Sequence, residues 1–303
     1  MKIYHEIFRE NDRPLVLAVG FFDGFHRGHR EIARRTMRLR KPGWRSGVLT
    51  FAEHPAAFLR PGGEPPLLAT LEERVDRFAE AGFEECFLID FDERISTLSP
   101  AEFLDRLIAL GVRGVVVGST FRFGHKRAGD AAFMSDYLGA RGVAFVAVEN
   151  VGLHGERISS TRIRGLIEAG DLELADDLLG GNGYELRGTV ALGFGRGHDL
   201  GFPTANLSVP SKLLPKDGVY SAIARYDGRD FAALVSIGSN PQFGGSARTV
   251  EAWLRDFHHT VYGREIALRE LRYVREQKLF AGVDELIEQM RRDLAAVAYP
   301  SYG

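Results

Sequence analysis

Residues 14–30 read PLVLAVGFFDGFHRGHR, and this stretch decides the fold of the first half of the chain. Its first nine residues form an apolar run, as expected of a strand that is buried on both faces. The rest is a glycine-containing turn and a helix start, in which His26 and His29 lie on either side of Gly28. A buried strand, a tight turn and a helix in this order predict the first unit of a parallel α/β sheet.

The alternation of strand and helix continues to about residue 150. Further strands are predicted at 46–51, 85–91, 113–118 and 142–148, and helices at 27–40, 71–82, 99–111 and 130–140. The helix that follows Ser99 begins with a capping box, because Pro100 takes the first helical position and Glu102 follows the cap by three residues. We therefore predict a Rossmann-like α/β domain, a parallel sheet with helices on both faces, over residues 1–180.

The second half has a different pattern. Residues 160–180 are predicted to be helical, and GGNG at 180–183 is the predicted linker. Short β-rich segments, broken by Gly, Pro and Asn, follow at 184–192, 218–226, 229–238, 248–257 and 265–275. This spacing predicts an antiparallel β-barrel over residues 184–303, with a C-terminal helix at 282–299 that carries one apolar face.

The bulk composition excludes several classes of protein. A chain of 303 residues that is 45% hydrophobic has room for two domains, each with its own core. A net charge of −2 argues against binding nucleic acid by bulk charge. No segment approaches the ~20 apolar residues of a membrane span, and the first residues lack the apolar core of a secretory signal peptide. We expect a cytoplasmic protein, monomer or weak homo-oligomer, without nucleic-acid or membrane partners.

The single cysteine, Cys86, cannot form a disulfide within the chain. Because it lies in an apolar strand-like segment, we expect a buried structural thiol.

The histidine turn is suited to phosphate chemistry. A helix N-terminus presents unpaired N–H groups and the positive end of the helix dipole, and both favour an anion. Gly24 and Gly28 would let a ligand approach the backbone closely. The two imidazoles could hydrogen-bond a phosphate whose charge grows during transfer. A zinc site is disfavoured, because no Cys, His or carboxylate lies nearby at a familiar spacing.

A second glycine-rich segment, GFGRGHDLGFPTANL at 193–207, lies in the predicted barrel. A dinucleotide fingerprint would need a helix next, and Pro203 interrupts one. A flap over the phosphates of ATP fits better. Thr204 and Asn206 present two oxygens on the same side of an extended chain, which suits Mg²⁺ bound to a nucleotide.

Several motifs resemble those of the bacterial bifunctional riboflavin kinase/FAD synthetases. FDGFHRGH at 22–29, the FRFG loop at 121–124 and RISSTRIR at 157–164 resemble the nucleotidyltransferase half. LGFPTAN at 200–206, PKDGVYSA at 215–222, SIGSNPQFGG at 236–245 and RTVEAWLRDF at 248–257 resemble the riboflavin kinase half. The resemblance covers nearly the whole chain in the same domain order.

In the first half the resemblance implies transfer of an adenylyl group from ATP to FMN, which gives FAD and pyrophosphate. The implied catalytic residues are His26, His29 and Arg164. The implied ATP-binding residues are Gly20, Phe22, Asp23, Gly24, Gly28, Ser159, Ser160, Thr161 and Arg162. Phe121, Arg122 and Phe123 would bind the flavin.

In the second half the resemblance implies phosphorylation of riboflavin by ATP. Glu251, which alone would be taken for a surface residue, becomes the base for the riboflavin 5′-hydroxyl. The implied phosphate-binding flap contains Gly193, Gly195, Arg196 and Gly197. Asn240 and Arg248 would bind the flavin, and Thr204 and Asn206 would hold Mg²⁺.

The first half departs from the family pattern at three places. Phe21 stands where the family usually has Asn, the family's FEPHP is FAEHP at 51–55, and Thr120 stands where Asp or Asn is usual. These departures motivate one alternative, a riboflavin kinase whose first domain adenylylates poorly. A second alternative, of a different class, is a non-catalytic flavin-binding or regulatory protein. A bifunctional enzyme that uses ATP, Mg²⁺ and flavins is the prediction.

Overall fold

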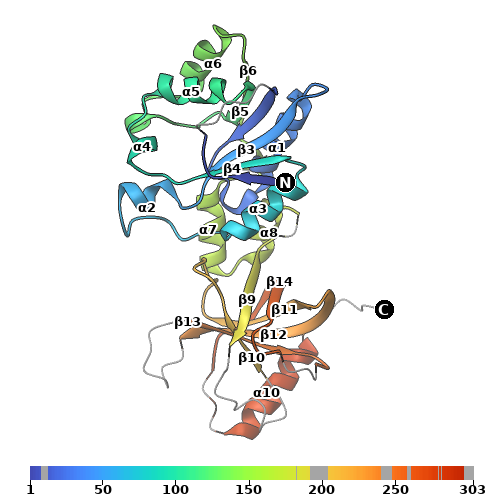
Figure 1. Cartoon of the computed structure of the whole chain (residues 1–303). Coiled ribbons are helices and arrows are strands. Elements are labelled where there is room, and N and C mark those ends of the chain that lie inside the picture. Colours follow the sequence, from blue (N-terminus) through green and yellow to red (C-terminus); the bar gives the residue numbers. More distant parts are fainter. Residues whose placement is uncertain are drawn as a thin grey trace. The chain divides into compact units, whose positions relative to one another are not determined.

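The computed structural model describes residues 1–7, 13–181, 183–191, 204–239, 248–257, 261–278, 280 and 282–296. The chain divides into two compact units, Met1–Ser160 and Thr161–Gly303 (Figure 1). The boundary predicted at 180–184 falls inside the second unit and stays a prediction. No helix of the described segments has the length and apolar character needed to cross a bilayer.

The first unit contains a six-stranded sheet in the order β1-β4-β3-β2-β5-β6, and every neighbouring pair is parallel. Its strands are β1 (Lys2–Tyr4), β2 (Leu15–Val19), β3 (Arg45–Phe51), β4 (Glu85–Ile89), β5 (Val112–Gly118) and β6 (Ala144–Val148). Its helices are α1 (Arg27–Leu39), α2 (Pro55–Leu59), α3 (Leu71–Glu80), α4 (Glu93–Ser96), α5 (Pro100–Ala109) and α6 (Ala131–Gly139). A two-stranded pair, β7 (Gly152–Leu153) and β8 (Glu156–Arg157), follows. The predicted parallel α/β domain is confirmed.

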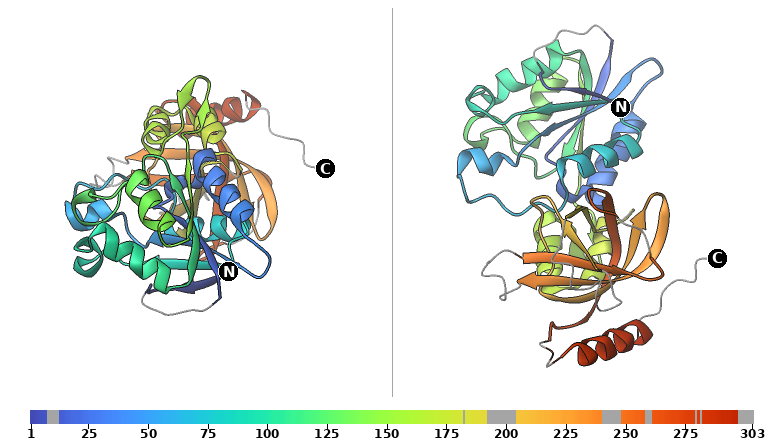
Figure 2. Two further views of the ribbon diagram at one scale, coloured as in Figure 1. Left: turned by 90° about the horizontal axis from the view of Figure 1, so that it is seen from above. Right: turned by 60° about the horizontal axis from the view of Figure 1, so that its bottom comes forward.

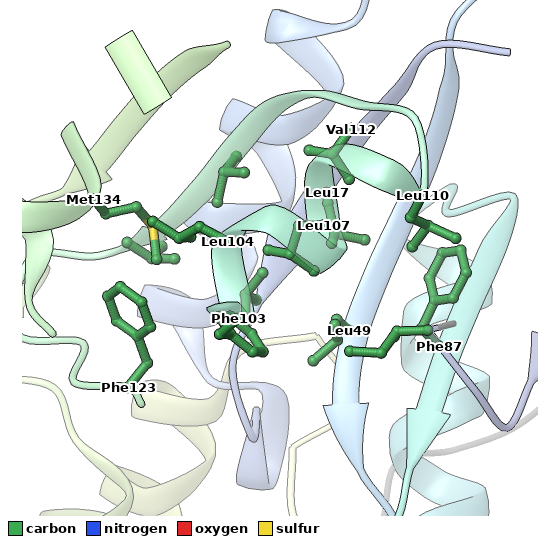
Figure 3. Packing of buried hydrophobic residues seen from close by; sticks show 14 of the residues in the cluster. Leu17, Leu49, Phe87, Phe103, Leu104, Leu107, Leu110, Val112, Phe123 and Met134 are labelled. Atoms are coloured by element: carbon green, nitrogen blue, oxygen red, sulfur yellow. The ribbon is translucent and has the colours of Figure 1, made fainter. Parts of the chain in front are cut away.

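Helices cover both faces of this sheet, because the strand residues alternate between two cores (Figure 2). On one face, Leu17 and Leu49 pack with Leu104 and Leu107 of α5, as Figure 3 shows. On the other face, strand residues pack with α1 and α3. The capping box predicted for α5 is present, since the Ser99 side chain accepts from the Glu102 N–H at 3.2 Å.

Cys86 lies in the second of these cores. It is fully buried, and burial raises the pKa of its thiol to about 12. The thiolate is therefore disfavoured, and the predicted structural role is confirmed.

The second unit contains a closed barrel in the order β10-β13-β12-β11-β14-β9. Its strands are β9 (Glu185–Ala191), β10 (Thr204–Ser208), β11 (Gly218–Tyr226), β12 (Arg229–Ser239), β13 (Arg248–Leu254) and β14 (Glu265–Arg275). Every neighbouring pair of strands in the barrel is antiparallel. The predicted barrel and its C-terminal helix, α10 (Val283–Ala296), are confirmed.

The helical segment predicted at 160–180 is two helices, α7 (Ser160–Ala169) and α8 (Leu172–Leu179). Gly170 takes a φ of 81°, which ends α7. The Asp171 side chain then accepts the Leu174 N–H at 3.3 Å and caps α8. The sequence predicted one helical segment because the apolar pattern continues across residues 170 and 171.

A buried ion pair fixes α10 to the barrel. The Asp293 carboxylate accepts hydrogen bonds from the Arg275 guanidinium at 2.8–3.1 Å, and Asp293 is 4% exposed. Gln289, one turn earlier on α10, donates to the same carboxylate at 2.8 Å. The right-hand view of Figure 2 shows α10 as a separate layer beside the barrel strands. The pair is therefore a main anchor of this helix.

Asp293→Ala should lower the free energy of unfolding of the barrel by about 3 kcal/mol, because it leaves a largely buried guanidinium without its carboxylate. In a Trp44→Phe background, Trp253 is the sole tryptophan, so its fluorescence in urea follows the barrel. Glu288→Ala, which breaks an exposed pair with Arg292, is the matched control and should change stability by less than about 0.5 kcal/mol. Equal effects of the two substitutions would contradict this account.

Candidate active sites

The turn after β2 has a backbone that few residues tolerate. Phe22 adopts a φ of 59° and Gly24 a φ of 76°, both in the left-handed region. A one-turn 3₁₀ helix, Asp23–Phe25, then leads into α1. His26 is the N-cap of α1, and its Nδ1 accepts the His29 N–H at 3.3 Å. The turn thus brings both histidines to the start of the helix.

The two imidazoles are stacked. Their ring centroids lie 3.6 Å apart with an interplanar angle of 16°. A Cβ on Gly28 would lie 3.1–3.2 Å from the His26 ring, so glycine keeps room for this imidazole. The His26 ring thus explains why glycine stands at position 28, and the expectation that Gly28 also lets a ligand approach the backbone stays a prediction.

Both histidines are held neutral. Burial lowers the pKa of His26 to about 4, and the positive charge of Arg157 adds to the lowering. Burial also lowers the pKa of His29 well below its usual value, and a charge on His26 would lower it further. The buried Nδ1 of His29 has no hydrogen-bond partner among the described residues. Neutral imidazoles can serve as hydrogen-bond donors or acceptors at neutral pH.

Asp23, predicted to contact ATP, instead uses its carboxylate inside the protein. It is 2% exposed, and it accepts the N–H groups of Leu68 and Ala69 at 3.0–3.2 Å. Arg77, also buried, donates to the Gly24 carbonyl at 2.8 Å. These bonds fix the histidine turn to the start of α3.

A second buried arginine, Arg74 on α3, joins the ends of β2 and β3. Its guanidinium donates to the carbonyls of Phe21 at 3.1 Å, Phe51 at 3.0 Å and Ala52 at 2.8 Å. It also lies over the Phe21 ring, 4.4 Å from the centroid. Arg74 was not identified from the sequence. It connects two of the positions at which the chain departs from its family pattern.

A cavity of about 320 Å³ lies beyond the ends of β3 and β4. Its lining residues are Ala52, Glu53, His54, Phe58, Asp90 and Phe91. Phe21 packs edge-on against His54 with centroids 4.6 Å apart. Clefts at the carboxyl ends of parallel strands are where such sheets bind ligands, and these aromatic walls suit a planar ring.

One serine of the second motif, Ser160, contacts the histidine turn. The Ser160 hydroxyl donates to the Asp23 carbonyl at 3.1 Å, and Ser160 is the first residue of α7. Thr161, Arg162 and Arg164 follow on that helix. Arg157, which the sequence reasoning passed over, donates to the Thr120 hydroxyl at 3.2 Å and acts electrostatically on His26. Arg157 could have been identified from the sequence, because it is the first basic residue of the RISSTRIR motif.

The FRFG loop, whose residues 121–123 were predicted to bind the flavin, also packs against the core of the first unit. Phe123 is 7% exposed and belongs to the core beside Phe103. Phe121 stacks on Phe123 with centroids 5.9 Å apart and is half-buried. Arg122 is exposed and pairs with Asp130 at 2.8 Å. Of the three, Phe121 and Arg122 have surface that a flavin could contact.

In the barrel, the strand pairing of β10 and β13 joins two predicted site residues. Asn206 lies directly opposite Glu251, and Thr204 opposite Trp253. Cross-strand partners share one face of a sheet, so the candidate base adjoins the candidate metal ligands. Glu251 is half-buried, and burial raises the pKa of its carboxyl.

The oxygen donors of Thr204 and Asn206 fit a hard cation. Within the described ranges, no three His, Cys, Asp or Glu side chains form a cluster suited to a metal ion.

Of the remaining predicted kinase residues, the structure describes Arg248. Arg248 pairs with Asp217 at 2.7 Å and donates to the carbonyls of Leu214 and Pro215, which fixes the start of β13. Five predicted residues lie outside the described segments: Gly193, Gly195, Arg196, Gly197 and Asn240.

The depressed histidine pKa gives a pH dependence of stability. Between pH 6.5 and about 4 the unfolded chain binds a proton at His26 that the folded protein does not, so the free energy of unfolding falls as the pH is lowered. At pH 5, protonation of His26 in the unfolded chain lowers the free energy of unfolding by about 2 kcal/mol relative to neutral pH. His26→Asn, which keeps a side-chain cap, should remove that part of the fall.

The measurement is urea unfolding at pH 7 and pH 5 in a Trp253→Phe background, where Trp44 reports on the first unit. His154→Asn replaces an exposed histidine in the β7–β8 turn and serves as the control. The account is wrong if the free energy of unfolding falls equally between pH 7 and pH 5 in His26→Asn and in His154→Asn.

Comparison with known proteins matches both halves of the chain to known families. Residues 8–162 match the family described as FAD synthetase, and residues 180–299 match the family described as riboflavin kinase. Proteins named bifunctional riboflavin kinase/FMN adenylyltransferase are similar over nearly their whole length. The one from Listeria monocytogenes is 35% identical, with 96% of this chain and 94% of the relative covered. That from Bacillus subtilis is 33% identical, with 95% and 93% covered.

A crystal structure named macrolide-efflux protein, from Streptococcus pneumoniae, has the same fold. It superposes with a TM-score of 0.87 at 30% identity, and 97% of each chain is covered. The name macrolide-efflux protein belongs to the streptococcal protein and is not carried over to this chain. Both family matches of this chain are to flavin enzymes. On these findings, the chain belongs to the family of bifunctional riboflavin kinase/FMN adenylyltransferases.

Proposed function

We propose that residues 184–303 phosphorylate riboflavin to FMN and that residues 1–180 adenylylate FMN to FAD, with ATP as the donor in both reactions. Family membership assigns both activities to the chain, with riboflavin, FMN, FAD and ATP as its substrates and products. One observation carries the division between two sites: the stacked histidines lie in one unit and the Asn206–Glu251 pair in the other.

Adenylylation is a single displacement. A phosphate oxygen of FMN forms a bond to the α-phosphorus of ATP, and the bond to the bridging oxygen breaks as pyrophosphate leaves. No covalent enzyme intermediate is needed, because positioning and stabilisation of charge supply the catalysis. We assign the α-phosphate to the histidine turn and the departing pyrophosphate to Arg164. Ser159, Ser160, Thr161 and Arg162 would hold the β- and γ-phosphates.

The neutral state of the histidines supports this assignment. A neutral imidazole donates one N–H, and it does so without the cost of burying a charge before the substrate arrives. The Nδ1 of His29 is buried and has no hydrogen-bond partner among the described residues, so its hydrogen-bonding capacity is unused there. Arg157 carries the permanent charge beside His26. Hydrogen bonding and charge are thus divided between different side chains.

The cavity beside Phe21 is our candidate for the isoalloxazine ring of FMN. Phe58 and Phe91 supply apolar walls, and their ring centroids lie 6.0 Å apart. Arg74 holds the carbonyls on which the Phe21 and Ala52 positions depend. The departure at Ala52 therefore falls at the wall of this cavity, and Phe21 packs on its wall residue His54, so both would alter flavin affinity more than phosphate chemistry. The third departure, Thr120, lies elsewhere, where its hydroxyl accepts from Arg157.

In the kinase reaction, Glu251 takes the proton of the riboflavin 5′-hydroxyl as that oxygen attacks the γ-phosphorus of ATP, and ADP leaves. The raised pKa of this carboxyl makes it a stronger base than an exposed glutamate. Thr204 and Asn206 would hold Mg²⁺. A bound Mg²⁺ neutralises charge on the phosphates and orients them.

A product assay by chromatography tests the proposal. With ATP and Mg²⁺, the purified protein should convert riboflavin to FMN and then FAD, and should convert FMN to FAD and pyrophosphate. Reactions without ATP are the control and should leave the flavins unchanged. FMN as the final product would mean a riboflavin kinase with an inactive adenylyltransferase domain. Flavin binding without ATP consumption would mean a non-catalytic flavin-binding protein.

A further inference from the structure

The outer face of the barrel carries a row of three polar side chains on neighbouring strands. Glu251 on β13 lies opposite Asn206 on β10 and opposite Ser236 on β12. The flanking residues Val250 and Ala252 are buried, whereas all three members of the row are half-buried. Directly opposite residues have Cβ atoms about 4.5–5.5 Å apart, so Asn206 and Ser236 flank the candidate base on its two sides.

A fourth polar group joins this row from outside the strands. Gln277, two residues after the end of β14, donates from Nε2 to the Ser236 hydroxyl at 2.9 Å. A Cβ on Gly238 would lie 2.4–2.8 Å from the Gln277 amide, so the amide packs directly on this glycine. Gly238 is two residues after Ser236 and therefore lies on the same face of β12. The position of the Gln277 side chain depends on that glycine.

The Ser236–Gln277 pair retains hydrogen-bonding capacity. Ser236 accepts from Gln277 and can still donate its own hydroxyl proton. Gln277 retains its carbonyl oxygen and a second N–H, and its side chain is exposed. Neither residue has another side-chain hydrogen bond to the part of the chain that the structure describes. Both can therefore meet a ligand that contacts Glu251.

We propose that Ser236 and Gln277 bind the secondary hydroxyls of the ribityl chain of riboflavin and so select flavins that carry a polyol. This inference rests on the proposed kinase function. If Thr204 and Asn206 hold the metal-bound nucleotide, ATP approaches Glu251 from the β10 side. The 5′-hydroxyl lies at Glu251, so the rest of the ribityl chain extends over β12. A hydroxyl and an amide there match a chain of hydroxyls, each both donor and acceptor.

The test compares riboflavin with an isoalloxazine that carries a 5-hydroxypentyl chain at N10. This analogue keeps the primary hydroxyl that is phosphorylated but lacks the secondary hydroxyls. Gln277→Ala and Ser236→Ala should each lower kcat/KM for riboflavin about five- to tenfold, mainly through KM, and leave kcat/KM for the analogue unchanged. The preference for riboflavin over the analogue should fall by the same factor.

Ser208→Ala, which removes an exposed hydroxyl from β10, is the matched control and should leave the preference unchanged. An equal loss for riboflavin and the analogue would mean that the pair only supports the barrel, and would overturn the inference, as would an unchanged preference. If the wild-type protein formed no FMN from riboflavin, the proposed kinase function would fail instead, so the two failures are distinguishable.

Discussion

The guanidinium of Arg74 is the group on which the proposed adenylyltransferase site depends. A fully buried charge is costly unless it is hydrogen-bonded, and here the two terminal nitrogens of the guanidinium donate to carbonyls at the ends of two adjacent strands, although its Nε has no partner among the described residues. The guanidinium therefore ties the end of β2, where the histidine turn begins, to the end of β3, where the candidate flavin cavity begins. The two parts of the proposed reaction, phosphate transfer and flavin binding, share this one support.

The kinase site is built by a different constraint. In the barrel, strand register alone places Asn206, Glu251 and Ser236 in one row, and the spacing of neighbouring strands fixes their separation. A slip of one residue would turn Glu251 into the barrel interior. Sheet pairing thus supplies here the precision that a buried arginine supplies in the first unit. The two proposed sites thus depend on different structural constraints, which agrees with two activities on one chain.

Much of the fold could be predicted, because long apolar strands and capped helices carry strong local signals. The three-residue strand β1 escaped prediction, since it is short and exposed at the sheet edge. The histidines, PTAN and Glu251 could be identified from motifs. The part played by Arg74 could not, because it depends on carbonyls more than 20 residues away in sequence. Likewise, the pairing of Gln277 with Ser236 spans 41 residues and has no local pattern.

The central claim is that the chain carries two separate sites, and mixing two variants tests it most directly. His29→Ala should make FMN but no FAD from riboflavin, and Glu251→Gln should make neither, although it still adenylylates added FMN. A mixture of the two variants, given riboflavin, ATP and Mg²⁺, should make FAD, because FMN released by one protein is adenylylated by the other. A mixture that makes no FAD, while each variant retains its remaining activity, would contradict exchange of FMN between separate sites. Loss of both activities in either variant would contradict their independence.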